Sequence, residues 1–236
     1  MNSIKHHIKT WLKRRLGVPQ IEFALERLAR SGVRPELVFD VGAYQGDFAR
    51  TCRSLWQQSD IACFEVQPAP LARLRAGFAN DPKFRAWPCL LGASLKDQVP
   101  LHLVETASSV LDEHIQHDYP VACFPMRTVD DVVQRDYGGR APGLLKLDVQ
   151  GYELEVLKGA EGSLKGMRVI LLETNFLDIY RNVPLVGEVM HWLRERGWVA
   201  YDICGLTRRP LDRALWQADM IFVPEGSPLR RDKRWN

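Results

Sequence analysis

The sequence predicts an α/β fold in which a mostly parallel β-sheet carries helices on both faces. Short apolar runs alternate along the chain with stretches whose apolar residues recur at helical spacing, which is the pattern of a doubly wound sheet. The composition is that of an average globular protein, with 236 residues of which 46% are hydrophobic and 26% charged. This length suits one large domain. Because no run of about 18 uncharged apolar residues occurs, we expect no transmembrane helix.

Five of the apolar runs are predicted to be parallel strands, because uninterrupted apolar residues indicate a strand covered on both faces. These runs span residues 37–42, 61–66, 84–92, 144–151 and 168–174. Helices are expected at residues 48–56, 70–78, 152–164 and 185–196. Two last runs, at residues 198–204 and 219–223, have a polar connection between them and are expected to pair antiparallel at the sheet edge.

Two helices are predicted before the sheet. Apolar residues at positions 4, 8, 11, 12 and 16 form one face of a basic amphipathic helix, which Gly17 and Pro19 end. A second helical pattern from residue 21 to residue 29 is closed by Ser31 and Gly32. We therefore divide the chain into a helical extension at residues 1–34 and a single domain at residues 35–236. Within this domain, residues 105–134 break the strand–helix rhythm and are expected to form an insertion over the carboxyl edge of the sheet.

Positive charge is concentrated at the N-terminus. The chain has a net charge of +3, but Lys and Arg contribute +5 to the first seventeen residues, which contain no acid. The rest of the chain therefore carries −2, which argues against general nucleic-acid binding. The basic helix could instead lie on an anionic membrane surface, contact RNA, dock on the body of the protein or form a homodimer contact, and these alternatives stay open.

Cysteine usage and the N-terminal residues predict the compartment. The five cysteines have no C-x-x-C spacing, which argues against a disulfide framework or a zinc site. The N-terminal residues lack the unbroken apolar core and the cleavage site of a secretory signal. We therefore expect a cytoplasmic protein, with the inner membrane face as the place where residues 1–17 would make peripheral contact.

A tight loop follows the first predicted strand. The strand ends near Asp40, and Gly42 and Gly46 lie four residues apart before the next helix, without the third glycine of the dinucleotide fingerprint. Glu65 ends the second strand, where an acid typically accepts hydrogen bonds from ribose hydroxyls. Two acids beside a glycine loop suit a nucleoside cofactor without phosphates, such as S-adenosylmethionine, whose amino and sulfonium groups are positive. The alternative is an ordinary strand–turn–helix unit in which Asp40 begins the helix.

Further acids at the same sheet edge are candidates for catalysis. Asp148 and Glu173 end two more predicted strands, where ligands of open α/β sheets bind. Asp148 is explained equally well as the cap of the following helix. His114 and His117 offer imidazoles as proton acceptors, or belong to a solvated loop. Neither this histidine patch nor the pair Asp130–Asp131 has a recognised ligand spacing, so no metal is assigned.

Together these segments resemble the FkbM-type family of S-adenosylmethionine-dependent methyltransferases, from about residue 37 to residue 224. The family's DVGAxxG loop is similar to residues 40–46, its FEPxP strand end to 64–68, its serine pair to 108–109 and its TLDD element to 128–131. Its most specific signature, KIDVEGxExxVLxGA, resembles KLDVQGYELEVLKGA at residues 146–160. Three residues depart from the family pattern, because Tyr44, Val66 and Gln150 replace Asn, Pro and Glu. The last change removes a negative charge that many relatives carry.

The resemblance implies a Rossmann-like class I methyltransferase fold with a seven-stranded sheet, and S-adenosylmethionine as the cofactor. By the same resemblance, cofactor contacts are expected from the first loop, from the ends of the second and third strands, and from Asp148. The residues implied are Asp40, Gly42, Ala43, Tyr44 and Gly46 at the methionine end, Glu65 at the ribose, and Val66, Gly92, Ala93 and Ser94 at the adenine.

The leading hypothesis is transfer of a methyl group to a hydroxyl of a saccharide, lipid-linked and polysaccharide acceptors included, or of a related natural product. Asp148, Glu173 and His114 are the candidates for the general base. One alternative is a non-catalytic cofactor-binding module that docks through its basic N-terminal helix. Another is an NAD(P)-dependent reductase, which the missing third glycine and the lack of a Tyr-x-x-x-Lys pair disfavour.

Overall fold

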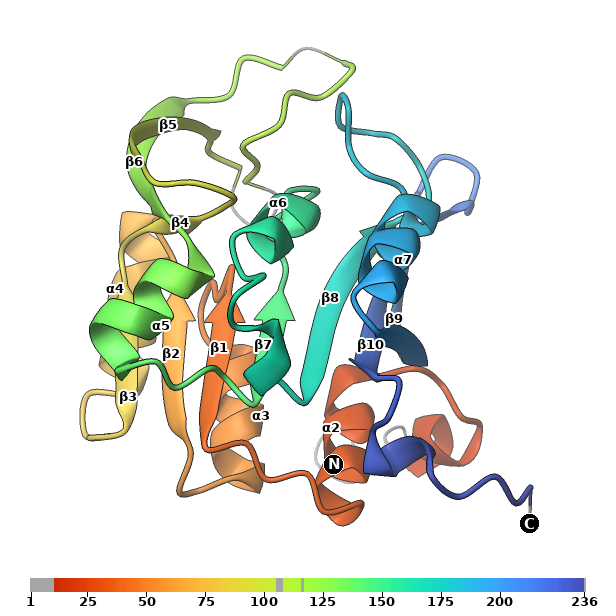
Figure 1. The fold of residues 1–236 in the computed structure, drawn as a ribbon. Coiled ribbons are helices and arrows are strands. Elements are labelled where there is room, and N and C mark those ends of the chain that lie inside the picture. The colour runs from red at the N-terminus through yellow and green to blue at the C-terminus, as the bar shows by residue number, and fades with distance from the viewer. Residues whose placement is uncertain (1–10, 105–107, 116, 236) are drawn as a thin grey trace, which may run out of the picture.

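A seven-stranded sheet forms the centre of the computed structural model, which describes residues 11–104, 108–115 and 117–235 (Figure 1). Its strands are β1 (Leu37–Val41), β2 (Asp60–Phe64), β3 (Phe84–Trp87), β7 (Leu144–Leu147), β8 (Val169–Asn175), β9 (Trp198–Arg208) and β10 (Leu215–Pro224). The strand order is β3-β2-β1-β7-β8-β10-β9. The first five strands in this order are parallel, and β10 runs antiparallel to both β8 and β9. The predicted α/β fold, its seven strands and the antiparallel pair at the edge are confirmed.

Helices cover both faces of this sheet. One face packs against α2 (Ile21–Arg30), α3 (Asp47–Leu55) and α4 (Pro68–Gly77), and the other against α5 (Val129–Tyr137), α6 (Glu153–Lys158) and α7 (Val186–Glu195). Successive residues of β1 alternate between the two cores: Phe39 packs with the second set of helices, and Val38 with the first. Both faces of the strand are therefore apolar, which is why the strands read as continuous hydrophobic runs.

A second, smaller sheet lies beyond the carboxyl ends of β1 and β2 (Figure 1). It consists of β4 (Leu90–Leu91), β5 (Lys96–His102) and β6 (Val121–Arg127) in the order β4-β6-β5. The prediction of one strand over residues 84–92 is therefore wrong. Pro88 lies between β3 and β4 and has no backbone N–H to donate to a neighbouring strand. The apolar run over residues 84–92 therefore divides into two strands, one in each sheet.

The prediction of an insertion over residues 105–134 is also wrong in part. Residues 121–127 form β6, and α5 begins directly after it and packs on the main sheet through Val129, Val132 and Val133. The helix begins where the Thr128 hydroxyl accepts a hydrogen bond from the backbone N–H of Asp131 at 3.0 Å. This T-x-x-D pattern is a helix-start signal that the sequence contains.

Helix α6 is shorter than the predicted helix over residues 152–164. It ends at Lys158, and only a single 3-10 turn, Leu164–Gly166, follows. The carboxylate of Asp130 accepts hydrogen bonds from the backbone N–H groups of Gly162, at 2.9 Å, and Ser163, at 2.8 Å. A continuing helix would direct these donors to its own carbonyl groups, so the bonds to Asp130 favour a turn.

The N-terminal extension is only partly described. Residues 1–10 lie outside the described part of the chain, and residues 11–15 are helical. Arg14 forms an ion pair at 2.8 Å with Glu26 of α2, and α2 buries Ala24, Leu25 and Leu28 in the core of the sheet. Among the described residues, no helix combines the length and the apolar character that crossing a bilayer needs. Membrane contact and homodimer formation through residues 1–17 stay predictions.

Candidate functional site

The strand order places a crevice at the carboxyl end of β1. Strand β1 has β2, the next strand along the chain, on one side and β7 on the other, so the direction in which strands are added to the sheet reverses at β1. Ligands of open α/β sheets bind at such a switch point. A cavity of about 250 Å³ lies there. Its walls come from the ends of β1 and β2, from the segment around β4, and from the loop between β7 and α6. Parts of the loop between β5 and β6 complete it, through Ser108 and Val110.

The first loop brings its backbone close to β7. Gly42 has a φ of +74°, and a Cβ atom at this position would lie 1.8 Å from the carbonyl oxygen of Asp148. Only glycine satisfies both conditions, since other residues seldom adopt this conformation and any side chain would collide with the backbone of β7. The missing side chain at Gly42 therefore lets the main chain of the loop approach the cavity closely.

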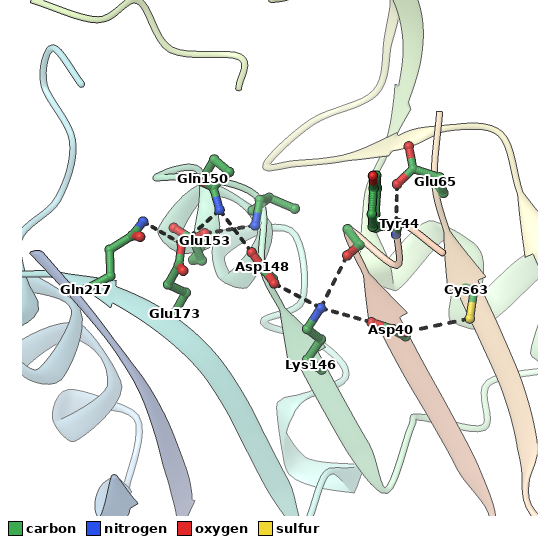
Figure 2. A network of polar contacts seen from close by, with 12 residues as sticks. Asp40, Tyr44, Cys63, Glu65, Lys146, Asp148, Gln150, Glu153, Glu173 and Gln217 are labelled. Atoms are coloured by element: carbon green, nitrogen blue, oxygen red, sulfur yellow. Dashed lines mark hydrogen bonds and ion pairs between the residues drawn. The ribbon is translucent and has the colours of Figure 1, made fainter. Parts of the chain in front are cut away.

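The carboxylate of Glu65 is fixed at the end of β2. It accepts hydrogen bonds from the backbone N–H groups of Tyr44, at 2.9 Å, and Gln67, at 2.8 Å (Figure 2). Burial raises the pKa of Glu65, and these backbone donors act in the opposite direction. Each carboxylate oxygen keeps a lone pair that the two bonds leave free, so Glu65 can accept hydrogen bonds from hydroxyl groups in the cavity.

A lysine lies beneath the loop and joins two of the predicted acids. The Nζ of Lys146 is 3.3 Å from Oδ1 of Asp40 and 3.2 Å from Oδ2 of Asp148 (Figure 2), and it donates a hydrogen bond of 3.2 Å to the carbonyl of Gly42. Burial lowers the pKa of Lys146, but the charges of Asp148 and Asp40 outweigh it and the net shift is upward. Lys146 therefore stays charged and ties the first loop to β7.

Gln150 connects Asp148 to a second acid. Its side-chain amide donates hydrogen bonds of 3.1 Å to both Asp148 and Glu173 (Figure 2). Gln217 donates a further bond of 2.6 Å to Glu173. Burial first, and then the charges of Asp148 and Glu153, raise the pKa of Glu173 well above its ordinary value. Gln150 itself has a φ of +54°, a strained conformation for a residue other than glycine, of the kind that occurs at functional sites.

The structure brings five of the predicted cofactor residues to the cavity wall: Gly42, Tyr44, Glu65, Val66 and Asp148. The others lie outside the lining. Asp40 is fully buried under the loop, and Ala43 and Gly46 are buried where the loop enters α3. Gly92 packs against Met126, whereas Ala93 and Ser94 are exposed. At this end of the cavity the wall is formed by Cys89, Leu90 and Leu91.

The candidate bases differ in position. Asp148 lines the cavity, and its side chain is 37% exposed. Its carboxylate does not cap α6, because the residue at the N-cap position is Tyr152 and no side-chain hydrogen bond caps this helix. Glu173 is half-buried and outside the lining, and His114 is exposed and also outside it. No three His, Cys, Asp or Glu side chains converge as metal ligands would in the described ranges.

Several residues at the site had no predicted role. Lys146 is a single lysine within the apolar strand β7, and this isolation was its signal in the sequence. Asp219 of β10 is a further, half-buried acid; its partial burial raises its pKa to about 6, and the charge of Asp148 adds to the effect. Leu101 of β5 and Val110, which lies in the segment that was expected to be an insertion, also line the cavity, and no pattern in the sequence marks them.

The cavity suits a cationic nucleoside better than a dinucleotide. Among the described residues that line it, the ionisable side chains include the carboxylates of Glu65 and Asp148, and neither Lys nor Arg is present. These carboxylates would repel a pyrophosphate, whereas they would attract a sulfonium and an ammonium group. Val66, Leu91 and Tyr152 provide apolar surface for a nucleobase. The residues present therefore fit S-adenosylmethionine.

Solved structures of methyltransferases are similar in fold. A candidate sarcosine dimethylglycine methyltransferase from Galdieria sulphuraria aligns with a TM-score of 0.52 at 12% identity, over 86% of this chain and 84% of that one. Magnesium protoporphyrin IX methyltransferase from Synechocystis PCC 6803, with bound S-adenosylmethionine, aligns with a TM-score of 0.49 at 9% identity, over 86% and 79%. At such identities the likeness shows the fold alone. No curated protein sequence matches the chain significantly.

A family model matches most of the catalytic domain. The model of the methyltransferase FkbM domain covers residues 40–199, which include the first loop, Glu65 and the KLDVQG segment after β7. The match covers more than half of the chain and decides against the reductase alternative. The chain therefore belongs to the FkbM family and is an S-adenosylmethionine-dependent methyltransferase.

Proposed function

We propose that this methyltransferase acts on oxygen, and that its acceptor is a hydroxyl group of a saccharide or of a related natural product, with Asp148 as the proton acceptor. The observation that carries the proposal is the position of Asp148, a partly exposed carboxylate on the wall of the cofactor cavity. A hydroxyl group loses a proton when it is methylated, so an acceptor of this kind needs a base beside the reacting atoms.

The residues that would hold the cofactor are Glu65, Gly42 and Tyr44 of the first loop, and the apolar wall at Val66 and Leu91. When bound, S-adenosylmethionine supplies an electrophilic methyl group on a positively charged sulfur. Glu65 would accept hydrogen bonds from the ribose hydroxyls with the lone pairs that its two backbone donors leave free. The apolar wall would exclude water from the nucleobase.

Asp148 is oriented for the role of base. Lys146 contacts one of its carboxylate oxygens and Gln150 donates a hydrogen bond to the other. These contacts fix the carboxylate, and such alignment of reacting groups contributes strongly to catalysis in transfer reactions. Glu173 suits the role less well, because it lies outside the cavity lining and already accepts hydrogen bonds from Gln150 and Gln217. The exposed imidazole of His114 lies outside the cavity lining.

Two matched substitutions test the assignment. Glu65→Gln is expected to weaken binding of S-adenosylmethionine by about 10-fold to 100-fold in calorimetry, because it removes a charged hydrogen-bond acceptor. Asp148→Asn is expected to lower kcat by about 10²-fold to 10⁴-fold, since it removes the base. Asp47→Asn, at an exposed aspartate that begins α3, is the control and should change neither quantity.

The assay measures transfer of a labelled methyl group to neutral, amino and acidic oligosaccharides. Transfer that depends on Asp148 supports the proposal. Cofactor binding without transfer to any saccharide would contradict the acceptor class and favour the non-catalytic module. Transfer that survives Asp148→Asn at the parent rate would contradict the base.

A further inference from the structure

A second cavity lies on the same edge of the molecule, beside the cofactor cavity. It has a volume of about 460 Å³, and its walls come from the loop between β5 and β6 and from the loop between β8 and α7. The described residues that line it include His102, Asp112, Glu113, His117, Tyr119 and Arg181. In contrast to the largely apolar cofactor cavity, this lining is rich in side chains that form hydrogen bonds.

Residues 108–111 contribute to the linings of both cavities. Ser108 and Val110 face the cofactor cavity, while Ser109 and Leu111, the alternate residues of the same segment, face the second one. The Ser109 hydroxyl donates a hydrogen bond of 2.7 Å to the backbone carbonyl of Gln150.

Side chains continue this link to the candidate base. The Tyr180 hydroxyl, in the lining of the second cavity, donates a hydrogen bond of 3.2 Å to the side-chain oxygen of Gln150. The amide of Gln150 contacts Asp148. One glutamine therefore lies between the candidate base and the second cavity, so a molecule that extends away from Asp148 would reach this cavity next.

The lining has the two kinds of group that recognise sugars. The carboxylate of Asp112 contacts His102 at 2.9 Å, and that of Glu113 contacts His117 at 3.5 Å, which leaves acceptor positions on both carboxylates for hydroxyl groups. The rings of His117 and Tyr119 stack with their centroids 4.9 Å apart. Aromatic surface of this kind packs against the C–H face of a pyranose, as it does against other flat apolar groups.

The charge of the lining limits the class of ligand. Asp112, Glu113 and Asp118 contribute three negative charges, and Arg181 contributes one positive charge. A phosphate or a carboxylate group would therefore be repelled, whereas a neutral hydroxyl or an ammonium group would be accepted.

We propose that the second cavity binds the part of a saccharide acceptor that lies next to the methylated sugar, and that it selects neutral or amino sugars over acidic ones. This inference rests on the proposed function. It narrows the acceptor to neutral or amino oligosaccharides and disfavours nucleotide sugars and uronic acids.

Ligand-observed NMR on the full-length protein, loaded with S-adenosylhomocysteine, tests the inference without requiring turnover. The probes are methyl cellobioside, the disaccharide of glucosamine, and cellobiouronic acid. The neutral and amino disaccharides are expected to bind at least fivefold more tightly than the acidic one. Tyr119→Ala is expected to weaken their binding at least fivefold. Tyr201→Ala, at an exposed tyrosine of β9 outside the cavity, is the matched control and should leave it unchanged.

A charge reversal gives a second, independent readout. Asp112 is 70% exposed, so Asp112→Lys should not disturb folding. It is expected to weaken binding of the glucosamine disaccharide and to tighten binding of cellobiouronic acid at least threefold. Tighter binding of the acidic probe to the parent protein would overturn the inference. So would failure of the neutral and amino probes to bind, or binding that neither substitution changes.

Failure of this inference differs from failure of the proposed function. If the cavity substitutions leave disaccharide binding unchanged while Asp148-dependent methyl transfer to saccharides persists, only the second cavity is wrongly assigned. If the disaccharides bind as expected but no saccharide is methylated, the cavity assignment stands and the proposed reaction is wrong.

Discussion

Lys146 and Asp40 are register partners on neighbouring parallel strands, and their charged groups lie 3.3 Å apart inside the protein. The side chain of Lys146 is 7% exposed and that of Asp40 is fully buried. Burial raises the pKa of Asp40, and Lys146 opposes the shift. No aligned hydrogen bond reaches Oδ1 of Asp40 within the described residues, so the ammonium group is the main compensation for that oxygen.

Removal of the lysine should therefore leave a buried charge without its partner. Lys146→Met is expected to lower the free energy of unfolding by about 3 to 5 kcal/mol, the range for breaking one side of a buried ion pair. Urea denaturation measures the change.

Two further variants make the interpretation specific. Lys158→Met removes an exposed lysine that pairs with Glu155 on α6, and it should cost less than about 1 kcal/mol. Adding Asp40→Asn to Lys146→Met should restore part of the lost stability, because it removes the orphaned charge. Equal effects of the two lysine substitutions would contradict the role assigned to Lys146.

The sheet could be predicted from the sequence because its strands are covered on both faces. β1 begins with the apolar residues 37–39 and β8 with the apolar residues 169–172, so the positions of both strands follow from hydrophobicity. The second sheet could not be predicted in this way. The first five residues of β6 alternate between exposed and half-buried, and its pairing with β5 depends on contacts far apart in the sequence.

The cofactor cavity was predictable at its glycine loop and at its acids, since these residue types have a chemical reason to be there. Its apolar wall was not, because Leu91 and Leu101 do not differ in the sequence from ordinary core residues. The role of Gln150 was hidden for another reason. Its contacts to Asp148, Glu173 and Tyr180 join three separate segments, and only the folded chain brings these together.

Gly42→Ala should remove cofactor binding and destabilise the fold by more than about 2 kcal/mol, because strain at positive φ adds to a backbone collision. Two other glycines separate these causes. Gly32 has a φ of +88° with open space around it, so Gly32→Ala should cost about 1 to 2 kcal/mol and leave binding intact. Gly187 has open space and no positive φ, so Gly187→Ala should be neutral or stabilising. Thermal unfolding and calorimetry give both quantities, and cofactor affinity retained in Gly42→Ala would contradict the close-approach argument.

Glu153 should make stability fall as the pH rises. Burial raises its pKa from 4.5 to about 7, so the folded state binds a proton that the unfolded state releases between these values. Its contribution is therefore most favourable below pH 4.5 and is lost as the pH rises toward 7.

Glu153→Gln keeps the acceptor oxygen for Val149 and Gly151 and removes the titration. The variant is expected to gain stability relative to the parent between pH 4.5 and pH 8, by about 3 kcal/mol at most, as urea unfolding at the two pH values would measure. Glu155→Gln on the same helix controls for the loss of one charge. A parent–variant difference that does not depend on pH would show that Glu153 does not titrate in this range.

Gln150→Glu tests why this chain departs from the family signature at that position. The amide of Gln150 donates to both Asp148 and Glu173, and a carboxylate would replace two attractive contacts with two repulsive ones. We expect a loss of about 1 to 3 kcal/mol at pH 8, the cost of leaving buried polar groups unsatisfied. The loss should be smaller at pH 5, because a proton shared among the three acids would relieve the repulsion, and the folded state then binds more protons than the unfolded one. Gln134→Glu, at an exposed position of α5, is the control and should show no such dependence on pH. Equal losses at pH 5 and pH 8, in urea unfolding of Gln150→Glu, would mean that Asp148 and Glu173 do not interact electrostatically through this side chain.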